Sequence, residues 1–426
     1  MKIKKLTKFF NKFVVKKYLK SLLFLIIFIS FFWKLDLIHN QVIYTNLFLI
    51  FSSIFLYERT NKIIYLFGWL FVYILNELLY LLFNIDLYPS GSRTELIYGG
   101  NSVVNKLFHW KDADINDSLY HNDNNLTESI FKNKKCISST EGEKNRFDYF
   151  IELLDIKEGD SVLDAGCGHG NMVKYMRDKG INAYGITLTN EQYIENKKRH
   201  GDYYYYGDYT EYNKNLHNKF DYIILPGSLE HPFGGNPMFM SSYKNKYEKM
   251  KDMFKMFKKY FKSNSKHKKI LTTCIHQQQP NSAILNTTRN KIIMYFTERM
   301  FGGLYPLYEK YGVKDSFKDA GYNVMNEIDR TWDYYYSSHC DILHFGNPYN
   351  LNPFIMLLAS PFNHFSIHTW VYWKYGMWMW MWSNKLHTRR DEDEKECDPN
   401  KSCDLYYEED KSKRPASLLY TIAQCK

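Results

Sequence analysis

The sequence has no arrangement of cysteine or histidine that would hold a zinc ion. Its seven cysteines are scattered along the chain, with no C-x-x-C pair and no histidine cluster beside them. Free thiols in a reducing compartment are the simpler interpretation. A nucleic-acid-binding motif is also absent, although the net charge is +10. That charge suits an anionic membrane surface as well as a nucleic acid, so we expect no metal and no nucleic-acid partner.

A glycine-rich turn is present, but without the acid that dinucleotide-binding sites require. The segment SVLDAGCGHG joins a short apolar strand containing Asp164 to glycines at 166, 168 and 170, and a helical pattern follows. Such a turn lets a ligand approach the backbone, and the helix start offers free N–H groups. The spacing is G-x-G-x-G rather than G-x-G-x-x-G, and the next strand ends in Thr187 rather than an acid. The pattern therefore argues against NAD and FAD.

Strands and helices alternate from Asp160 to about Gly346, which predicts a mostly parallel, doubly wound α/β sheet. Further strands are expected at Ile181–Ile186, near Asp208, at Phe220–Leu225 and in KKILTTCIH. One helix is expected around Phe147, Phe150 and Leu154, and a long helix over Tyr243–Phe261. Ligands of such sheets bind at the carboxyl ends of strands. The polar residues at those ends are Asp164, Thr187, Asp208, Glu230 and His276.

The turn and the strand order resemble the S-adenosylmethionine-dependent methyltransferase fold, whose first motif is similar to VLDAGCGHG. The resemblance implies a seven-stranded Rossmann-like sheet. It also implies that the glycine turn faces the methionine and ribose portion of S-adenosylmethionine. The cofactor-binding residues expected on this basis are Asp164, Gly166, Cys167, Gly168, Gly170, Thr187, Leu188, Gln192, Asp208 and Tyr209.

A narrower resemblance is carried by YGITLTNEQ, GDYTE and LEH. These segments are similar to the cyclopropane-fatty-acyl-phospholipid synthase family, which includes mycolic acid synthases and sphingolipid C9-methyltransferases. Thr187 and Gln192 match the family segment after the second strand, and Asp208 and Tyr209 resemble its segment beside the adenine. Glu230 stands where the family has a Glu-His pair. The resemblance covers about residues 133–346.

The chemistry of that family explains these residue types. A lipid double bond is a weak nucleophile that attacks the electrophilic methyl group of the cofactor and becomes a carbocation. Loss of a proton then gives a cyclopropane or a methyl-branched alkene. The site must exclude water, must stabilise positive charge, for which aromatic faces are suited, and needs a base.

In the family, a bound bicarbonate is the base, so the resemblance implies bicarbonate as a second group beside S-adenosylmethionine. The residues of its site that match singly are Cys136, Glu230, Ile275 and Tyr334. Thr273 stands where the family has its histidine, and His276, three residues later, is the candidate substitute. A structural role fits His276 equally well.

The N-terminal 88 residues are expected to form a membrane anchor. Eight lysines precede the first apolar run, and no small-residue cleavage site follows it, which argues against a signal peptide. We expect a two-pass hairpin at about Leu19–Ile38 and Val42–Tyr57. The third run, Ile63–Tyr88, carries Asn76 and Glu77 and would lie in the interface or re-enter. In the alternative hairpin, the second and third runs cross and the first lies flat.

The membrane topology is predicted from the N-terminal lysines and from the cytosolic location of the cofactor. Lysines place the N-terminus in the cytosol. A catalytic domain that uses a cytosolic cofactor then follows an even number of crossings, so we expect a multi-pass membrane protein with its catalytic domain facing the cytosol.

The remaining boundaries complete the domain prediction. A connector and substrate cap is expected over residues 89–136, and the methyltransferase domain over 137–346. Residues 347–390 contain tryptophans that cover more than one helix face, which favours a helix at the membrane interface. Residues 391–426 are expected to be a charged tail.

The leading hypothesis is a membrane-bound methyltransferase that acts on a membrane lipid with an unsaturated acyl or sphingoid chain. One alternative is a methyltransferase for another membrane acceptor, such as a quinone or sterol. The other is a catalytically degenerate fold that serves as a membrane scaffold, which the intact glycine turn and Asp208 disfavour.

Overall fold

The structure is a computed structural model. It describes residues 68–83, 139–235, 239–277, 310–331 and 416–426, together with Ile85, Ser129, Ile130, Pro306, Leu307, Tyr308, Tyr295 and Asp333. Several expectations lie outside the described residues: the two crossings at Leu19–Ile38 and Val42–Tyr57, the connector and cap over 89–136 except Ser129 and Ile130, the site residues Cys136 and Tyr334, the aromatic helix at 347–390, and residues 391–415 of the expected tail.

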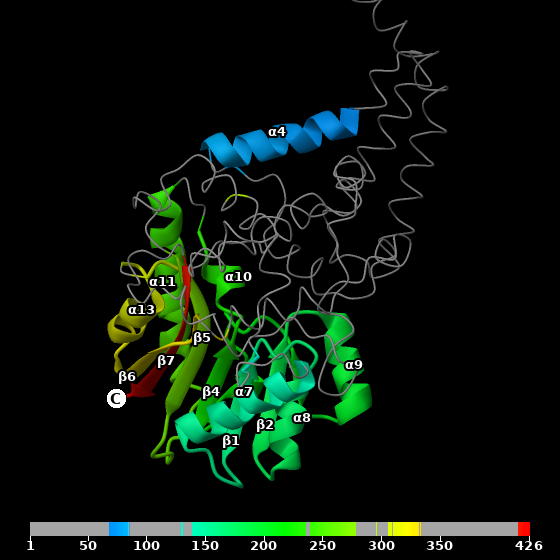
Figure 1. The fold of residues 1–426 in the computed structure, drawn as a ribbon, viewed down its shortest axis with the longest axis vertical. Coiled ribbons are helices and arrows are strands. Elements are labelled where there is room, and N and C mark those ends of the chain that lie inside the picture. The colour runs from blue at the N-terminus through cyan, green and yellow to red at the C-terminus, as the bar shows by residue number, and fades with distance from the viewer. Residues whose placement is uncertain are drawn as a thin grey trace, which may run out of the picture.

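The described core is a seven-stranded sheet in the order β3-β2-β1-β4-β5-β7-β6 (Figure 1). Its strands are β1 Ser161–Ala165, β2 Asn182–Thr187, β3 Tyr204–Tyr206, β4 Tyr222–Pro226, β5 Lys269–Gln277, β6 Tyr322–Asp329 and β7 Ala416–Cys425. The pairs among β1 to β5 are parallel, and β7 runs antiparallel to both β5 and β6. The prediction of a mostly parallel, seven-stranded, Rossmann-like sheet is confirmed.

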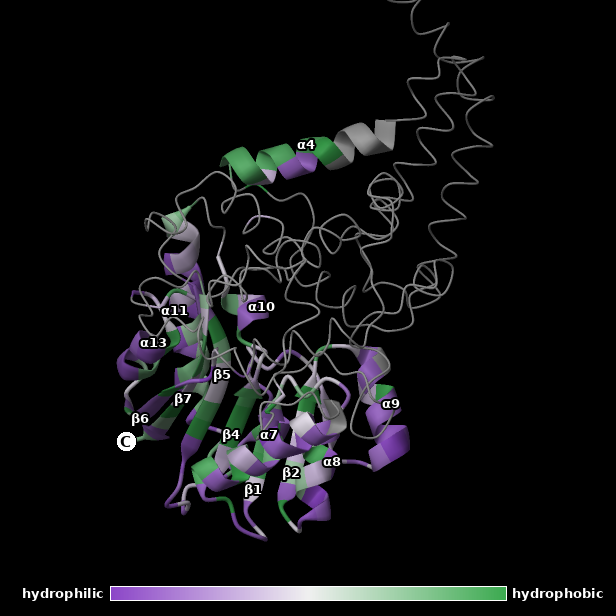
Figure 2. Ribbon diagram, in the orientation of Figure 1, coloured by the Kyte–Doolittle hydropathy of each residue, from purple (hydrophilic) through white to green (hydrophobic). Residues whose placement is uncertain are grey.

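Helices cover both faces of this sheet. They are α7 Ser139–Leu154, α8 Asn171–Asp178, α9 Asn190–His200, α10 Glu230–Phe233, α11 Met240–Phe257 and α13 Val313–Asp319, with a short 3₁₀ helix at Lys214–Leu216. α7 and α8 bury Phe147 and Met176 against one face, whereas α11 and α13 bury Phe254 and Phe317 against the other. Apolar residues at helical spacing therefore point to the sheet, whose central strands β4 and β5 are hydrophobic (Figure 2).

The last strand corrects the expected charged tail. Ala416–Cys425 forms β7 and inserts between β5 and β6, so these residues belong to the sheet and not to a tail over 391–426. The segment ASLLYTIAQC is apolar, and its first eight residues are buried. Its register with β5 runs from Ala416, opposite Gln277, to Gln424, opposite Lys269. The lysines and acids that suggested a tail lie immediately before the strand.

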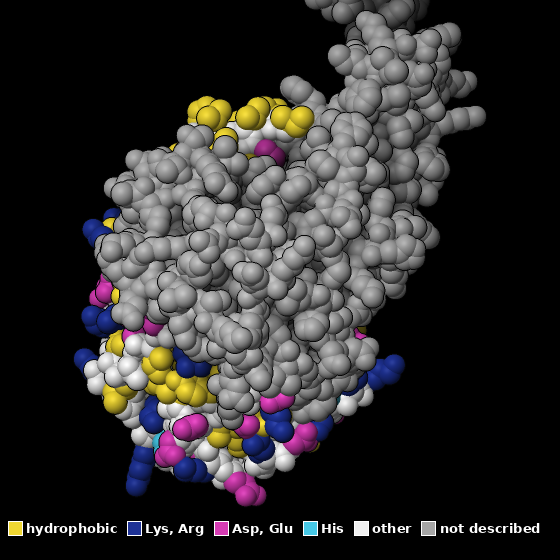
Figure 3. Space-filling view, in the orientation of Figure 1, with side chains coloured by type: hydrophobic (Ala, Val, Ile, Leu, Met, Phe, Trp, Pro, Cys, Tyr) yellow, Lys and Arg dark blue, Asp and Glu magenta, His cyan; other side chains and the backbone are white. Residues whose placement is uncertain are grey.

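Part of the third apolar run forms α4, Gly68–Phe83. Among the helices in the part of the chain that the structure describes, none has both the length and the apolar character needed to cross a bilayer. The polar Asn76 is fully buried, and the Tyr295 hydroxyl donates to Glu77 Oε2 at 2.6 Å. Five apolar side chains of α4 are instead exposed, Ile74, Leu75, Leu78, Leu82 and Phe83. Figure 3 shows a row of hydrophobic side chains along this helix.

Candidate active site

The glycine turn between β1 and α8 is held open by its backbone conformation. Gly166, Gly168 and Gly170 have φ angles of +94°, +51° and +76°, which favour glycine. The amides of Gly166 and Cys167 both donate to Ile186 O at 3.0 Å, which ties the turn to the end of β2. A Cβ built on Gly168 would have no atom within 4 Å. The backbone at Gly168 is therefore accessible to a ligand.

Side chains from neighbouring elements fix this turn from the outside. The Asn196 amide of α9 donates to Gly168 O at 2.8 Å, and the Tyr204 hydroxyl of β3 donates to Gly170 O at 3.1 Å. Cys167 packs against Gly185, where a Cβ would lie 2.6 Å from its sulfur. Burial and the nearby Asp164 raise the pKa of the Cys167 thiol, so this cysteine is a neutral packing residue.

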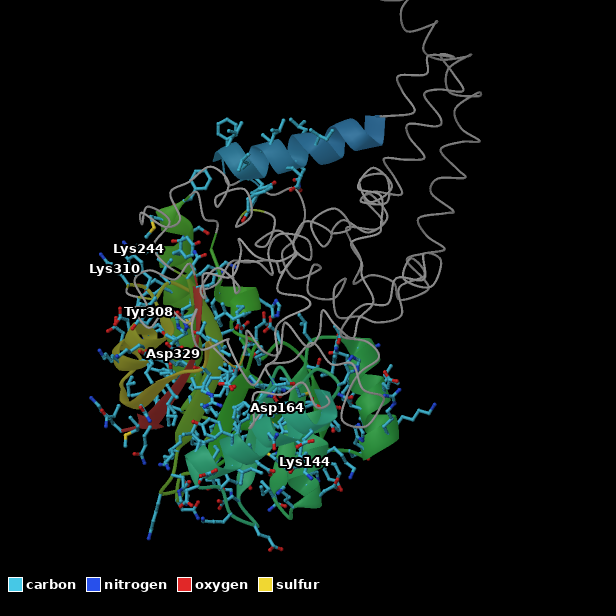
Figure 4. All side chains as sticks on the ribbon, in the orientation of Figure 1. Lys144, Asp164, Lys244, Tyr308, Lys310 and Asp329 are labelled. Carbon is cyan, nitrogen blue, oxygen red and sulfur yellow. The ribbon has the colours of Figure 1, made fainter. Side chains whose placement is uncertain are left out.

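Asp164 lies at the carboxyl end of β1 with its carboxyl group buried (Figure 4). Its Oδ1 atom has no hydrogen-bond partner among the described residues. Burial raises the pKa of this carboxyl to about 8, and the charge of Arg146 partly opposes the rise. A buried acid with an unpartnered oxygen is a favourable neighbour for a positively charged ligand.

Side chains at the end of β2 and at the start of α9 are joined by hydrogen bonds. Thr187 Oγ1 donates to Gln192 Oε1 at 2.8 Å, and the Thr189 hydroxyl donates to the same oxygen at 2.5 Å. Thr189 is also the residue that precedes α9, and Leu188 between the threonines is half-buried. This network fixes the start of α9 beside the glycine turn, which makes Thr187 and Gln192 positioning residues in this structure.

Tyr209 connects the ends of β3, β4 and β1. Its hydroxyl donates to Ser228 O at 2.8 Å, and Ser228 Oγ in turn donates to Ala165 O at 3.0 Å. Burial raises the pKa of Tyr209, so its hydroxyl stays protonated and acts as a donor. Asp208 precedes Tyr209 in the chain. Its Oδ1 atom accepts hydrogen bonds from the Thr210 amide at 2.8 Å and from the Thr210 hydroxyl at 2.7 Å, and these bonds close a local turn.

Glu230 is the buried acid at the end of β4. Its Oε1 accepts the Ile275 amide at 2.7 Å, so two of the residues expected in the catalytic set are in direct contact. Thr273, at the position of the family histidine, accepts the Gly227 amide with its Oγ1 at 2.9 Å. Thr273 therefore holds the end of β4.

The side chain of His276 lies on the face of β5 opposite to the side chain of Ile275. Successive side chains of a strand alternate between faces, and Ile275 joins the core under α7 and α8 whereas Cys274 joins the core under α11 and α13. His276 shares the face of Cys274, and its Nδ1 donates to Cys274 O at 2.9 Å. The side chains of His276 and Ile275 therefore point away from each other.

Sequence reasoning missed two residues that shape the site. Asn196 holds Gly168, and it lies four residues after Gln192, on the same face of α9. Ser228 holds the end of β1, and no local pattern distinguishes it from an ordinary loop serine. The helical spacing from Gln192 was the signal available for Asn196.

These features together fit S-adenosylmethionine. An open glycine turn accepts a ligand at close range, and Asp164 Oδ1, which has no partner in the described part of the chain, suits its positively charged groups. Among the described residues, no group of histidine, cysteine, aspartate and glutamate could hold a metal ion.

Comparison with known proteins identifies the family. The family model for mycolic acid cyclopropane synthetase matches residues 113–339, which is more than half of the chain. A protein of Mycobacterium tuberculosis described as a probable fatty acid methyltransferase is 32% identical over 103 residues, or 21% of this chain and 24% of its own length. The (S)-tetrahydroprotoberberine N-methyltransferase of Eschscholzia californica is 24% identical over 159 residues, or 35% of this chain and 44% of its own length.

The alignments to these curated relatives therefore span less than half of the relatives' own length. Among solved structures, a cyclopropane synthase from Mycobacterium tuberculosis has a TM-score of 0.49 at 14% identity, covering 80% of this chain and 100% of that one. A mycolic acid cyclopropane synthase solved with SAH and CTAB has the same TM-score and identity, covering 79% and 99%. On the extent of the family match, the chain belongs to the mycolic acid cyclopropane synthetase family and is an S-adenosylmethionine-dependent methyltransferase.

Proposed function

We propose that the protein is a membrane-bound enzyme that adds one carbon to a double bond in the acyl or sphingoid chain of a membrane lipid. The observation that carries this proposal is the buried carboxylate of Glu230, held by the Ile275 amide at the ends of β4 and β5. In this family, that position belongs to the site that removes a proton from the lipid. The overall change is the gain of a methyl group and the loss of one proton.

Glu230 is suited to receive that proton. When bound, S-adenosylmethionine supplies an electrophilic methyl group. The Ile275 amide fixes one oxygen of Glu230, so the carboxylate needs no reorganisation before it acts. Glu230 is 4% exposed, which limits the access of water to a positively charged lipid chain.

The identity of the base is the second part of this proposal. The resemblance assigns Glu230 and the Ile275 backbone to a bicarbonate site, and here they contact each other directly. Thr273 is engaged with Gly227 and offers no imidazole. We therefore propose that Glu230 itself is the base. Turnover in carbonate-free buffer should stay within about twofold of normal, and activity that requires added bicarbonate would contradict this.

The membrane part of the proposal is supported by the orientation of α4. A helix on a soluble surface buries its apolar face, but α4 buries Asn76 together with Tyr80 and exposes five other apolar residues. The exposed side chains are Ile74, Leu75, Leu78, Leu82 and Phe83, with 38% to 63% of each surface accessible. We propose that this face rests in the bilayer, next to the lysine-rich anchor, with the catalytic domain on the cytosolic side.

A second candidate function is methyl transfer to an amine nitrogen. It is favoured by two relatives named as N-methyltransferases, which are 24% and 29% identical over parts of the chain. It is also favoured by Thr273, because methylation of an amine requires no bicarbonate-type site with a histidine.

An assay with defined lipids separates the two candidates. The full-length protein would be reconstituted in vesicles of phosphatidylcholine with either oleoyl or stearoyl chains, and supplied with cofactor labelled in its methyl group. We expect label in the acyl fraction of the oleoyl vesicles alone. The absence of acyl label would contradict the lipid proposal, and label transferred to an added amine would favour the second candidate.

A further inference from the structure

The turn between β4 and α10 carries Glu230 and is held to β5 at both ends. β4 ends at Pro226, which lies opposite Thr273 of β5. At the start of the turn, the Gly227 amide donates to Thr273 Oγ1 at 2.9 Å and to Thr273 O at 3.0 Å. At its end, Glu230 Oε1 accepts the Ile275 amide at 2.7 Å. Two residues of one strand therefore fix the first and the last residue of this turn.

The geometry of β5 explains why Thr273 and Ile275 act as a pair. Residues two apart in a strand share a face, and Leu271 and Ile275 both belong to the core under α7 and α8, so Thr273 shares that face. Amides two apart likewise point to the same neighbouring strand. After Thr273, the next amide directed at β4 is that of Ile275, where β4 has already ended. The carboxylate of Glu230 takes the place of the next β4 carbonyl there.

The middle of the turn is fixed by two other parts of the sheet. The Tyr209 hydroxyl donates to Ser228 O at 2.8 Å, and Ser228 Oγ donates to Ala165 O at 3.0 Å. Residues 228 and 229 alone separate the two ends that β5 holds. In so short a segment, a displacement at the Thr273 end is passed on to Glu230.

We propose that Thr273 is a positioning residue for the methyl transfer, and that its hydroxyl keeps the Glu230 carboxylate in the orientation that the reaction needs. This inference rests on the proposed role of Glu230 as the base. A base must lie within hydrogen-bond reach of the proton that it removes, and a shift of about 1 Å can cost about a hundredfold in rate. The position that the resemblance assigns to a histidine therefore serves here to hold the base itself.

Two buried threonines of β5 provide a matched pair of variants. Thr273→Val removes the hydroxyl and keeps the branched shape of the side chain. The Gly227 amide retains its bond to the carbonyl of residue 273, so no buried donor loses its partner and the variant should fold. Thr272→Val is the control, because Thr272 is also fully buried but its Oγ1 makes no hydrogen bond to a described residue.

Turnover of the full-length protein would be measured with methyl-labelled cofactor, on acyl chains or on an added amine, whichever the wild type labels. We expect Thr273→Val to lower turnover about ten- to a hundredfold and to change the cofactor affinity, measured by calorimetry, by less than about twofold. Thr273→Ser restores the hydroxyl and should recover most of the turnover. Thr272→Val should match the wild type.

Combination with Glu230→Gln separates positioning from a general structural role. If Thr273 acts through Glu230, Thr273→Val should lower turnover no further in the Glu230→Gln protein. An equal loss in both backgrounds, or a fully active Thr273→Val enzyme, would overturn the inference and leave Glu230 as the base. A fully active Glu230→Gln enzyme would instead remove the proposed base, and this inference with it.

Hydrogen exchange tests the same contact without turnover. In the peptide that covers residues 227–230, exchange should be at least about threefold faster in Thr273→Val than in the wild type. It should be unchanged in Thr272→Val. Equal exchange in all three proteins would contradict a role for the Thr273 hydroxyl in holding the turn.

Discussion

At the scale of single residues, two buried carboxyl groups have different surroundings and therefore different tasks. Asp164 has one oxygen without a hydrogen-bond partner in the part of the chain that the structure describes, and burial raises its pKa to about 8. Glu230 is fixed by the Ile275 amide. The first is arranged to meet a positively charged ligand, and we propose the second as the group that receives a proton.

The raised pKa of Asp164 predicts a dependence of stability on pH. The cofactor-free folded protein keeps a proton up to about pH 8, whereas an unfolded aspartate loses it near 3.8. Between these values the folded state binds more protons, so the free energy of unfolding should fall as pH rises, by up to about 1.4 kcal/mol per pH unit. Urea titrations should show that Asp164→Asn removes this slope and that Asp178→Asn, at an exposed ion pair, keeps it. An unchanged slope in Asp164→Asn would exclude Asp164 as its source.

Substitution of Glu230 by glutamine should separate chemistry from binding. Glutamine keeps an oxygen for the Ile275 amide but is not a base, so the local structure should survive. We expect turnover to fall by at least about a hundredfold, in line with the loss of a general base. Cofactor affinity by calorimetry should stay within about twofold, and Glu248→Gln, at a half-exposed side chain of α11, serves as the control. An active Glu230→Gln enzyme would remove this residue from the mechanism.

At the scale of elements, β1 to β5 could be predicted from the sequence because their signals are local. The clearest case is the apolar run Ser161–Ala165, which is followed by a turn and the amphipathic helix α8. β7 could not be located in this way. Its neighbours in the sheet, β5 and β6, lie far back in the sequence, and charged residues precede it. The pairing that makes Ala416–Cys425 a strand is a property of the folded chain.

The same distinction applies to the site. Asp164 and the glycines were predictable because the strand, the turn and the helix are consecutive in the chain. The contact between Glu143 and Asn171, by contrast, depends on the packing of α7 against α8. Position along the chain carries no signal for such a contact. His276 follows Ile275 directly in the sequence, but the two side chains lie on opposite faces of β5, so its place in the catalytic set stays a prediction.

If β7 is an integral strand, truncating one of its core side chains should destabilise the whole domain. Leu418 is fully buried in the core under α7 and α8. We expect Leu418→Ala to lower the free energy of unfolding by about 2 to 5 kcal/mol. Met325→Ala, at a side chain 53% exposed on β6, should change it by less than about 0.5 kcal/mol. A small effect of Leu418→Ala in denaturant titrations would contradict the inserted strand.

The proposed membrane face of α4 can be tested with labelled cysteines. Leu82 is 59% exposed on the apolar face of α4, and Met325 is 53% exposed on β6. In the reconstituted protein, a fluorophore on Leu82→Cys should be quenched by brominated lipids, and one on Met325→Cys should not, after subtraction of the signal from the labelled wild type. Equal quenching at both positions would contradict contact between α4 and the bilayer.

At the scale of the whole molecule, the residues that we expect to bind the cofactor lie at the carboxyl ends of the strands, and α4 exposes an apolar face. The family fixes the cofactor and the class of reaction. The acceptor is the part of the function that we propose. An apolar face beside the catalytic domain is consistent with a substrate that lies in a membrane and would reach the site without crossing water.

The identity of the acceptor is the central claim, and lipid mass spectrometry tests it most directly. The full-length protein and Glu230→Gln would be expressed in a host rich in monounsaturated lipids, and the acyl and sphingoid chains would be fragmented. We predict chains heavier by one CH₂, about 14 Da, only where a double bond was present and only with the wild-type protein. Unmodified chains in both strains, or the extra mass confined to a head-group amine, would contradict the account.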